Sequence, residues 1–147
     1  MISWRYATAK ENEMIRGSCH CGSIHWEFDG VPESTTACNC TACRRIGALW
    51  AYEWDNEGIR IRAVPGMLAG YVRPNGDLAF HFCKACGNTT HWRGLAPSEK
   101  GKTRIAVNLR LSEHPEEVAK IPVRHFDGLD SWSDLPDDGK CVADLWF

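Results

Sequence analysis

The chain has 147 residues, 44% of them hydrophobic and 24% charged, which excludes a disordered chain and predicts a single globular domain over residues 1–147. Its formal net charge of -2 provides no long-range attraction for phosphate backbones, so no nucleic-acid partner is expected. The first thirty residues lack the pattern of a secretory signal, and no apolar run reaches the ~18 residues that cross a bilayer. We therefore expect a cytoplasmic protein without a membrane partner, in which the eight cysteines do not pair as disulfides.

Runs of aromatic and β-branched residues, separated by turn residues, predict a mainly β protein of antiparallel sheets. The clearest turn is Pro74-Asn75-Gly76-Asp77, which is typical of a tight hairpin between the strands on either side. Other turns are expected at 29–30, 56–58 and 65–66. In chain order, the expected strands are 23–29, 48–54, 59–63, 67–73, 77–83, 88–92 and 104–111.

Little helix is expected. A short helical turn is predicted within 41–46, and residues 112–118 combine a capping serine with proline and acidic residues in a first turn. The segment 127–140 is rich in Asp, Gly, Ser and Pro, so we interpret it as a surface extension. Its end, Leu145-Trp146-Phe147, carries apolar side chains that would anchor it to the body of the domain.

Seven of the eight cysteines lie in three clusters with the spacing of metal ligands. The clusters are Cys19 with Cys21, Cys38 with Cys40 and Cys43, and Cys83 with Cys86, and Cys141 stands alone. On an extended chain a C-x-C pair places both sulfurs on one side, and a C-x-x-C pair does the same around a tight turn. Gly22 and Gly87 follow two of the clusters and tolerate the positive φ that such turns require.

The sizes of the clusters divide the cysteines between two zinc ions. Structural zinc normally has four protein ligands, whereas catalytic zinc has three and leaves one position open. The first and third clusters together supply four thiolates and predict a closed, structural site. The middle cluster supplies three thiolates without an obvious fourth ligand and predicts an open, catalytic site. We therefore expect two zinc ions per chain.

Other uses of the cysteines stay open. Disulfides are disfavoured because neighbouring C-x-C cysteines would form strained bridges. Both metal sites could instead be structural, and the second would then take a fourth ligand from His20, His81, His91 or Cys141. If Cys141 has no such role, we interpret it as a partly buried spare thiol.

Three motifs in the same order, GSCHCG at 17–22, CNCTACRR at 38–45 and FCKACG at 82–87, resemble the glutathione-dependent formaldehyde-activating enzyme (GFA) family, which includes the centromere protein V branch. The likeness covers roughly residues 15–125 and leaves a C-terminal extension at 127–147. The resemblance implies a β-tent fold of antiparallel sheets with zinc-binding cysteine loops. It also implies a structural zinc on Cys19, Cys21, Cys83 and Cys86, and a catalytic zinc on Cys38, Cys40 and Cys43, where the sulfur of glutathione would act.

The activity implied by the resemblance is that of a zinc-dependent carbon-sulfur lyase similar to S-(hydroxymethyl)glutathione synthase. Such an enzyme forms or cleaves the adduct of a glutathione-type thiol and a small aldehyde, and zinc would lower the pKa of the incoming thiol. The carboxylates of glutathione favour cations near the metal, and Arg44 and Arg45 directly follow the middle cluster. Both arginines could equally balance thiolate charge or cover apolar surface. His91 and Trp92 are candidates for lining the pocket.

A second function from another class is a non-catalytic zinc-binding module for a protein or chromatin partner, in which both metals would be structural. A basic face would favour this function, and the composition shows none. The identity of the thiol and the aldehyde, the direction of the reaction and the formation of a homodimer are left open by the sequence.

Overall fold

The computed structural model describes residues 13–145. The expectations for residues 1–12, where a secretory signal would lie, and for Trp146 and Phe147 as anchors concern residues outside this range. Within it, the chain is mainly β, as predicted, with 44% strand and 11% helix. No helix of the described part is long and apolar enough to span a membrane.

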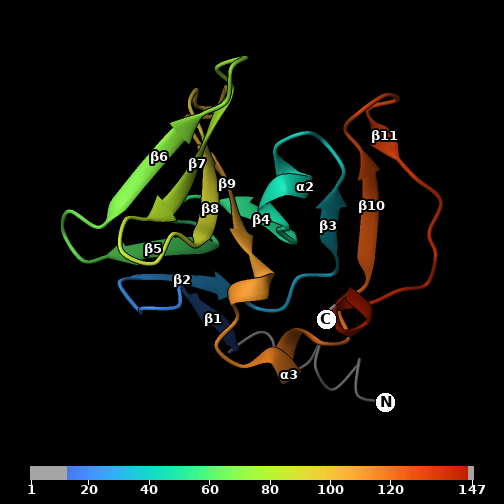
Figure 1. The fold of residues 1–147 in the computed structure, drawn as a ribbon, viewed down its shortest axis with the longest axis horizontal. Coiled ribbons are helices and arrows are strands. Elements are labelled where there is room, and N and C mark those ends of the chain that lie inside the picture. Colours follow the sequence, from blue (N-terminus) through green and yellow to red (C-terminus); the bar gives the residue numbers. More distant parts are fainter. Residues whose placement is uncertain (1–12, 146–147) are drawn as a thin grey trace.

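The strands form two sheets (Figure 1). The smaller sheet has the order β1-β2-β5, with β1 at Met14–Ser18, β2 at Ile24–Asp29 and β5 at Ile59–Ala63. The larger sheet has the order β11-β10-β3-β4-β9-β8-β7-β6. Its strands are β3 (Thr35–Cys38), β4 (Trp50–Trp54), β6 (Leu68–Val72), β7 (Leu78–Cys83), β8 (Thr89–Gly94), β9 (Arg104–Asn108), β10 (Val123–Asp127) and β11 (Ser133–Asp134).

Helices are short, as the sequence predicts. In the described residues they are α2 (Cys43–Ile46) and α3 (Pro115–Val118), with single 3-10 turns at η1 (Leu109–Leu111) and η2 (Val142–Leu145). The hairpin predicted at 74–77 joins β6 to β7, and Gly76 takes a left-handed φ of 76° there. Two features were not predicted. Strands β1, β3, β10 and β11 fall outside the expected list, and β10 pairs with β3 in parallel.

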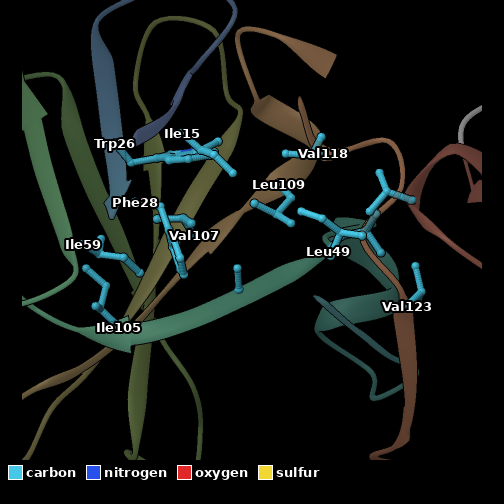
Figure 2. Packing of buried hydrophobic residues seen from close by; sticks show 13 residues of the cluster. Ile15, Trp26, Phe28, Leu49, Ile59, Ile105, Val107, Leu109, Val118 and Val123 are labelled. Carbon is cyan, nitrogen blue, oxygen red and sulfur yellow. The ribbon is translucent and has the colours of Figure 1, made fainter. Parts of the chain in front are cut away.

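The main core lies between the two sheets, where side chains of β1, β2, β5 and β9 form one buried cluster (Figure 2). Trp26 and Ile59 from the smaller sheet and Ile105 and Val107 from β9 are all 0% exposed. The ring of Trp26 lies directly on the backbone of Gly17, where a Cβ atom would overlap it. Glycine at this position therefore allows β1 to pack closely, immediately before the first cysteine cluster.

The opposite face of the larger sheet packs on α2. Successive side chains of a strand point to opposite faces, so Ala106 lies in a second buried cluster while its neighbours on β9 lie in the main core. This second cluster contains Trp50, Phe80 and Trp92 together with cysteines of the middle cluster. The rings of Trp50 and Phe80 stack with centroids 6.0 Å apart. Apolar packing thus fixes α2 on the sheet.

Candidate metal centres

The first and third cysteine clusters meet at one site, which we call the four-cysteine site. It contains Cys19, Cys21, Cys83 and Cys86, whose sulfur atoms all lie within 4.8 Å of one another. The sulfur of Cys21 lies 3.7 Å from that of Cys19 and 3.5 Å from that of Cys83. A tetrahedral ion with metal–sulfur bonds of about 2.3 Å requires sulfur–sulfur separations of about 3.8 Å, so these distances fit a metal of zinc's size.

Backbone amides point at the sulfurs of the four-cysteine site. The N–H of Ile24 donates to the Cys19 sulfur and the N–H of Ala85 donates to the Cys83 sulfur, each at 3.3 Å. Hydrogen bonds of this kind stabilise thiolates, because the donors face the negative charge. The two turns are also tied together, since the amide of His20 donates to the side-chain oxygen of Asn88 at 2.7 Å. The site is therefore held by the backbone of both hairpins.

The middle cluster forms a second group, the three-cysteine site. Cys38 ends β3, Cys43 begins α2, and Cys40 lies in the turn between them. The three sulfurs lie within 4.8 Å of one another, and among residues 13–145 no His, Asp, Glu or further Cys adds a fourth ligand atom to the group. The described part of the chain can thus offer this site three thiolates, one fewer than a closed zinc site takes.

The three-cysteine site lies against the apolar cluster beneath α2. Cys40 and Cys43 are 4% and 7% exposed. The indole N–H of Trp50 donates to the Cys43 sulfur at 3.3 Å, and the backbone N–H of Cys43 donates to the Cys40 sulfur at the same distance. Cys38 is half-buried. Cys38 is therefore the least covered of the three thiols.

The loop after β10 covers part of the three-cysteine site. A Cβ atom on Gly128 would lie 2.7 Å from the Cβ of Cys40 and 2.9 Å from the sulfur of Cys38, so only glycine fits there. The side chain of Asn39 fixes the loop: its oxygen accepts from the N–H of Gly128 at 2.8 Å, and its amide donates to Asp127 at 3.3 Å. Gly128 belongs to the segment 127–140, for which the sequence predicts a surface extension and not a part of the site.

The thiols ionise unevenly in both groups. In the three-cysteine site, the hydrogen bond between Cys38 and Cys43 lowers the pKa of Cys38 to about 6. The same hydrogen bond, followed by burial, raises the pKa of Cys43 far above its usual value. In the four-cysteine site, burial raises the pKa of Cys19 to about 11, whereas the hydroxyl of Ser23, 3.2 Å away, lowers the pKa of Cys21 to about 6. A cation that needs every thiol ionised therefore competes with protons at both sites.

The alternative fourth ligands lie elsewhere. The rings of His81 and His91 stack on each other across β7 and β8 with centroids 4.8 Å apart, and burial lowers the pKa of both, so they stay neutral at pH 7. His20 lies in the turn of the four-cysteine site. The sulfur of Cys141 lies 3.4 Å from a carboxylate oxygen of Asp144 near the C-terminal turn. None of the four belongs to the three-cysteine group.

A cavity of about 590 Å³ lies beside the three-cysteine site. Its walls come from the turn between Cys40 and α2, from α2 itself and from the hairpin of β6 and β7. The lining residues are Thr41, Ala42, Arg45, Ile46, Tyr71, Arg73, Pro74, Asn75, Phe80, Phe82 and Thr89.

The structure separates the two candidate arginines. Both are exposed, but Arg45 lines the cavity and donates to the carbonyl oxygen of Thr41 at 2.8 Å, whereas Arg44 does not line it. His91 and Trp92, the expected pocket residues, do not line it either; both are buried. Arg73 does line the cavity but was not singled out in the sequence, where its place next to the hairpin turn was the available signal.

Residues 14–125 match the family model described as glutathione-dependent formaldehyde-activating enzyme. The chain belongs to this family. The family match includes all seven clustered cysteines and ends before Gly128, so the loop that covers the three-cysteine site lies outside it. The similarity stated from the three sequence motifs is thus confirmed, with nearly the same bounds.

The fold of this family member is similar to a crystal structure of a Rhodobacter sphaeroides protein. The two share 25% sequence identity with a TM-score of 0.56, and the match covers 74% of this chain and 98% of the other. No curated protein matches the chain. The family membership therefore rests on the family model and the cysteine motifs. The substrate and the reaction must be argued from the cysteine groups and the cavity of this chain.

Proposed function

We propose that the protein is a zinc-dependent carbon-sulfur lyase that forms or cleaves the adduct of a glutathione-type thiol and a small aldehyde such as formaldehyde. The family description supports glutathione and formaldehyde as reactants. The observation that carries the proposal is the inequality of the two cysteine groups, since one has four sulfurs and the other has three beside a cavity. A closed site suits a structural metal, and a site with three protein ligands suits catalysis.

The four-cysteine site would hold the structural zinc and the three-cysteine site the catalytic zinc, giving two ions per chain. Sulfur-only donor sets favour zinc among the common divalent cations, and the sulfur spacing of the four-cysteine site fits it. Zinc bound to Cys38, Cys40 and Cys43 would favour the ionised form of an incoming thiol, as it does for coordinated thiols generally. These three residues would then be the catalytic set that the resemblance implies.

The reaction is balanced without an oxidant or reductant. In the forward direction the thiol loses its proton, a sulfur lone pair forms a bond to the aldehyde carbon, and the carbonyl π electrons move to oxygen, which takes up a proton. The product is a hydroxymethyl thioether. In reverse, the hydroxyl loses its proton, the C=O bond forms again, and the carbon–sulfur bond breaks with its electron pair going to sulfur. The sulfur leaves as a thiolate and takes up a proton, which makes the reaction a lyase step.

The protein's own groups would support this step by position and charge. The Trp50 indole and the backbone N–H groups donate to the cysteine sulfurs, which disperses charge on the ligands and fixes their orientation. Arg45 on the cavity wall is a suitable contact for a substrate carboxylate. Arg44 lies outside the cavity and suits charge balance at the surface better.

The test is the Cys40→Ser variant. We expect two zinc ions in the purified wild type and one in the variant, with an unchanged fold and with turnover reduced to the spontaneous rate of adduct formation. The measurements are zinc content by mass spectrometry, circular dichroism, and NMR detection of adduct formation from labelled formaldehyde and glutathione. Cys141→Ser is the matched control, because Cys141 lies outside both groups.

The non-catalytic module predicts a different pattern. Both metals would then be structural, and loss of either would unfold the chain. Turnover by Cys40→Ser equal to that of wild type would refute the lyase. Unfolding of Cys40→Ser, together with no wild-type turnover above the spontaneous rate, would support the module instead.

A further inference from the structure

We propose that the cavity beside the three-cysteine site is a carboxylate-binding pocket, and that Arg73 selects thiols that carry a carboxylate. The thiol at the other end of such a ligand rests on the proposed function. The carboxylate subsite rests on the cavity itself, and it can be tested with a ligand that has no thiol.

The charge of the cavity differs from that of the whole chain. Its lining contains two arginines, Arg45 and Arg73, and no acidic residue, whereas the chain as a whole has a net charge of -2. The two arginines belong to separate elements, since Arg45 lies in α2 and Arg73 follows β6. Cations on two walls of one cavity suit an anionic ligand held between them.

The guanidinium of Arg73 is well placed to bind. Its side chain is 19% exposed and lies in the wall, so less conformational freedom is lost on binding than for an exposed arginine. The structure gives it an ion pair with Asp77, whose oxygen lies 3.8 Å from Nε. The two terminal nitrogens can still form a bidentate fork with a carboxylate. Asp77 itself is not part of the lining.

The rest of the cavity defines the ligand further. Ile46, Phe80 and Phe82 provide apolar wall, and Tyr71 and Asn75 provide polar groups near Arg73. Two further lining residues, Thr41 and Ala42, belong to the turn between Cys40 and Cys43, so the cavity adjoins the three-cysteine site there. A ligand that fills this space is therefore longer than a small aldehyde, with a carbon chain between an anionic end and an end near the cysteines.

The experiment measures binding of S-methylglutathione to zinc-loaded protein by calorimetry. This ligand has both carboxylates of glutathione, but its sulfur carries no ionisable proton. We expect Arg73→Gln to weaken binding on the order of ten- to a hundred-fold, and Arg73→Lys to weaken it less, because lysine keeps the charge but not the fork. Arg62→Gln is the control: Arg62 is 74% exposed and lies on β5, in the other sheet.

A second ligand tests whether binding depends on the charge of the carboxylates or only on the shape of the ligand. The dimethyl ester of S-methylglutathione should bind wild type as weakly as the acid binds Arg73→Gln. The inference is overturned if wild type does not bind S-methylglutathione, if Arg73→Gln binds it within about twofold of wild type, or if the ester binds as well as the acid. Failure of the proposed function looks different: binding would keep its dependence on Arg73, while no adduct of any thiol with formaldehyde would form above the spontaneous rate.

Discussion

The two cysteine groups use the same ligand but differ in how much of the chain they join. In the four-cysteine site, Cys21 and Cys83 are 62 positions apart, and the site links the turn after β1 to the turn between β7 and β8. The three-cysteine site lies within a single segment, from the end of β3 to the start of α2. A metal at the first site closes a long loop, whereas a metal at the second site closes a very short one.

The fold depends more on the four-cysteine site than on the three-cysteine site. A cross-link that closes a long loop removes much of the freedom of the unfolded chain, and one that closes a short loop removes little. The four-cysteine site joins the smaller sheet to the larger one, while α2 is already fixed by Trp50 and Phe80. A metal at the four-cysteine site should therefore contribute most to the stability of the fold. The fold should depend less on a metal at the three-cysteine site.

The largest effect is expected from Cys19→Ser. Cys19 is 1% exposed and its loss would remove one of four ligands, so the structural metal should be lost and the chain should unfold. Structural zinc contributes on the order of 10 kcal/mol, comparable with the whole free energy of unfolding of a typical domain. Circular dichroism measures the unfolding, and the zinc content of the purified protein measures the loss of the metal. A folded Cys19→Ser protein that keeps one zinc would show that the site is dispensable.

The local parts of this architecture could be predicted, because their signals lie in short stretches of sequence. The hairpin at 74–77 follows from its Pro, Asn and Gly residues, and the cysteine groups follow from their spacing. Strand β1 was missed because Met14–Ser18 contains arginine, glycine and serine in place of a β-branched run. It forms because β2 pairs with it along its full length.

The long-range parts could not be predicted from sequence. Strand β10 pairs in parallel with β3. The two strands are far apart in the sequence: Asn39, which follows β3, and Asp127, which ends β10, are separated by 88 positions. No local pattern encodes such a partner. This pairing places Gly128 over Cys38 and turns part of a supposed surface extension into a wall of the site. The cavity arises in the same way, because Arg45 and Arg73 meet only when α2 packs on the β6–β7 hairpin.

Cys43→Ser should give a smaller loss of stability than Cys19→Ser. We expect it to lose the second zinc and the activity while staying folded, because the site closes only a short loop. The free energy of unfolding should fall by about 1–3 kcal/mol, from the lost hydrogen bond of Trp50 and the lost metal. Thermal unfolding of Cys43→Ser is compared with that of Cys19→Ser. Equal melting temperatures would contradict the division between the sites.

Gly128→Ala should affect the three-cysteine site alone. The added methyl group would overlap Cys40 and the sulfur of Cys38, so the loop or the cysteines must shift, at a cost of about 1–3 kcal/mol. Affinity for the second zinc should drop, with the first zinc retained, as measured by competition with a chromophoric chelator. The matched control is Gly94→Ala, whose Cβ would meet its nearest neighbour at an ordinary 3.6 Å. Equal zinc affinity in both variants would show that the loop gives way freely.

The smallest effect is a difference in pH between the two metal losses. Zinc needs ionised thiols, so protons displace it as the pH falls. The raised pKa of Cys43 means that the three-cysteine site must release a tightly held proton to bind metal, and it has only three thiolates to offer. We therefore expect it to lose zinc at a higher pH than the four-cysteine site does. A titration from about pH 8 to about pH 4 with a zinc-sensitive dye should show two steps of roughly one ion each, and Cys43→Ser should lack the first. A single step of two ions would mean that the sites hold metal equally, because the extra thiolate and the long closed loop would then give the four-cysteine site no advantage.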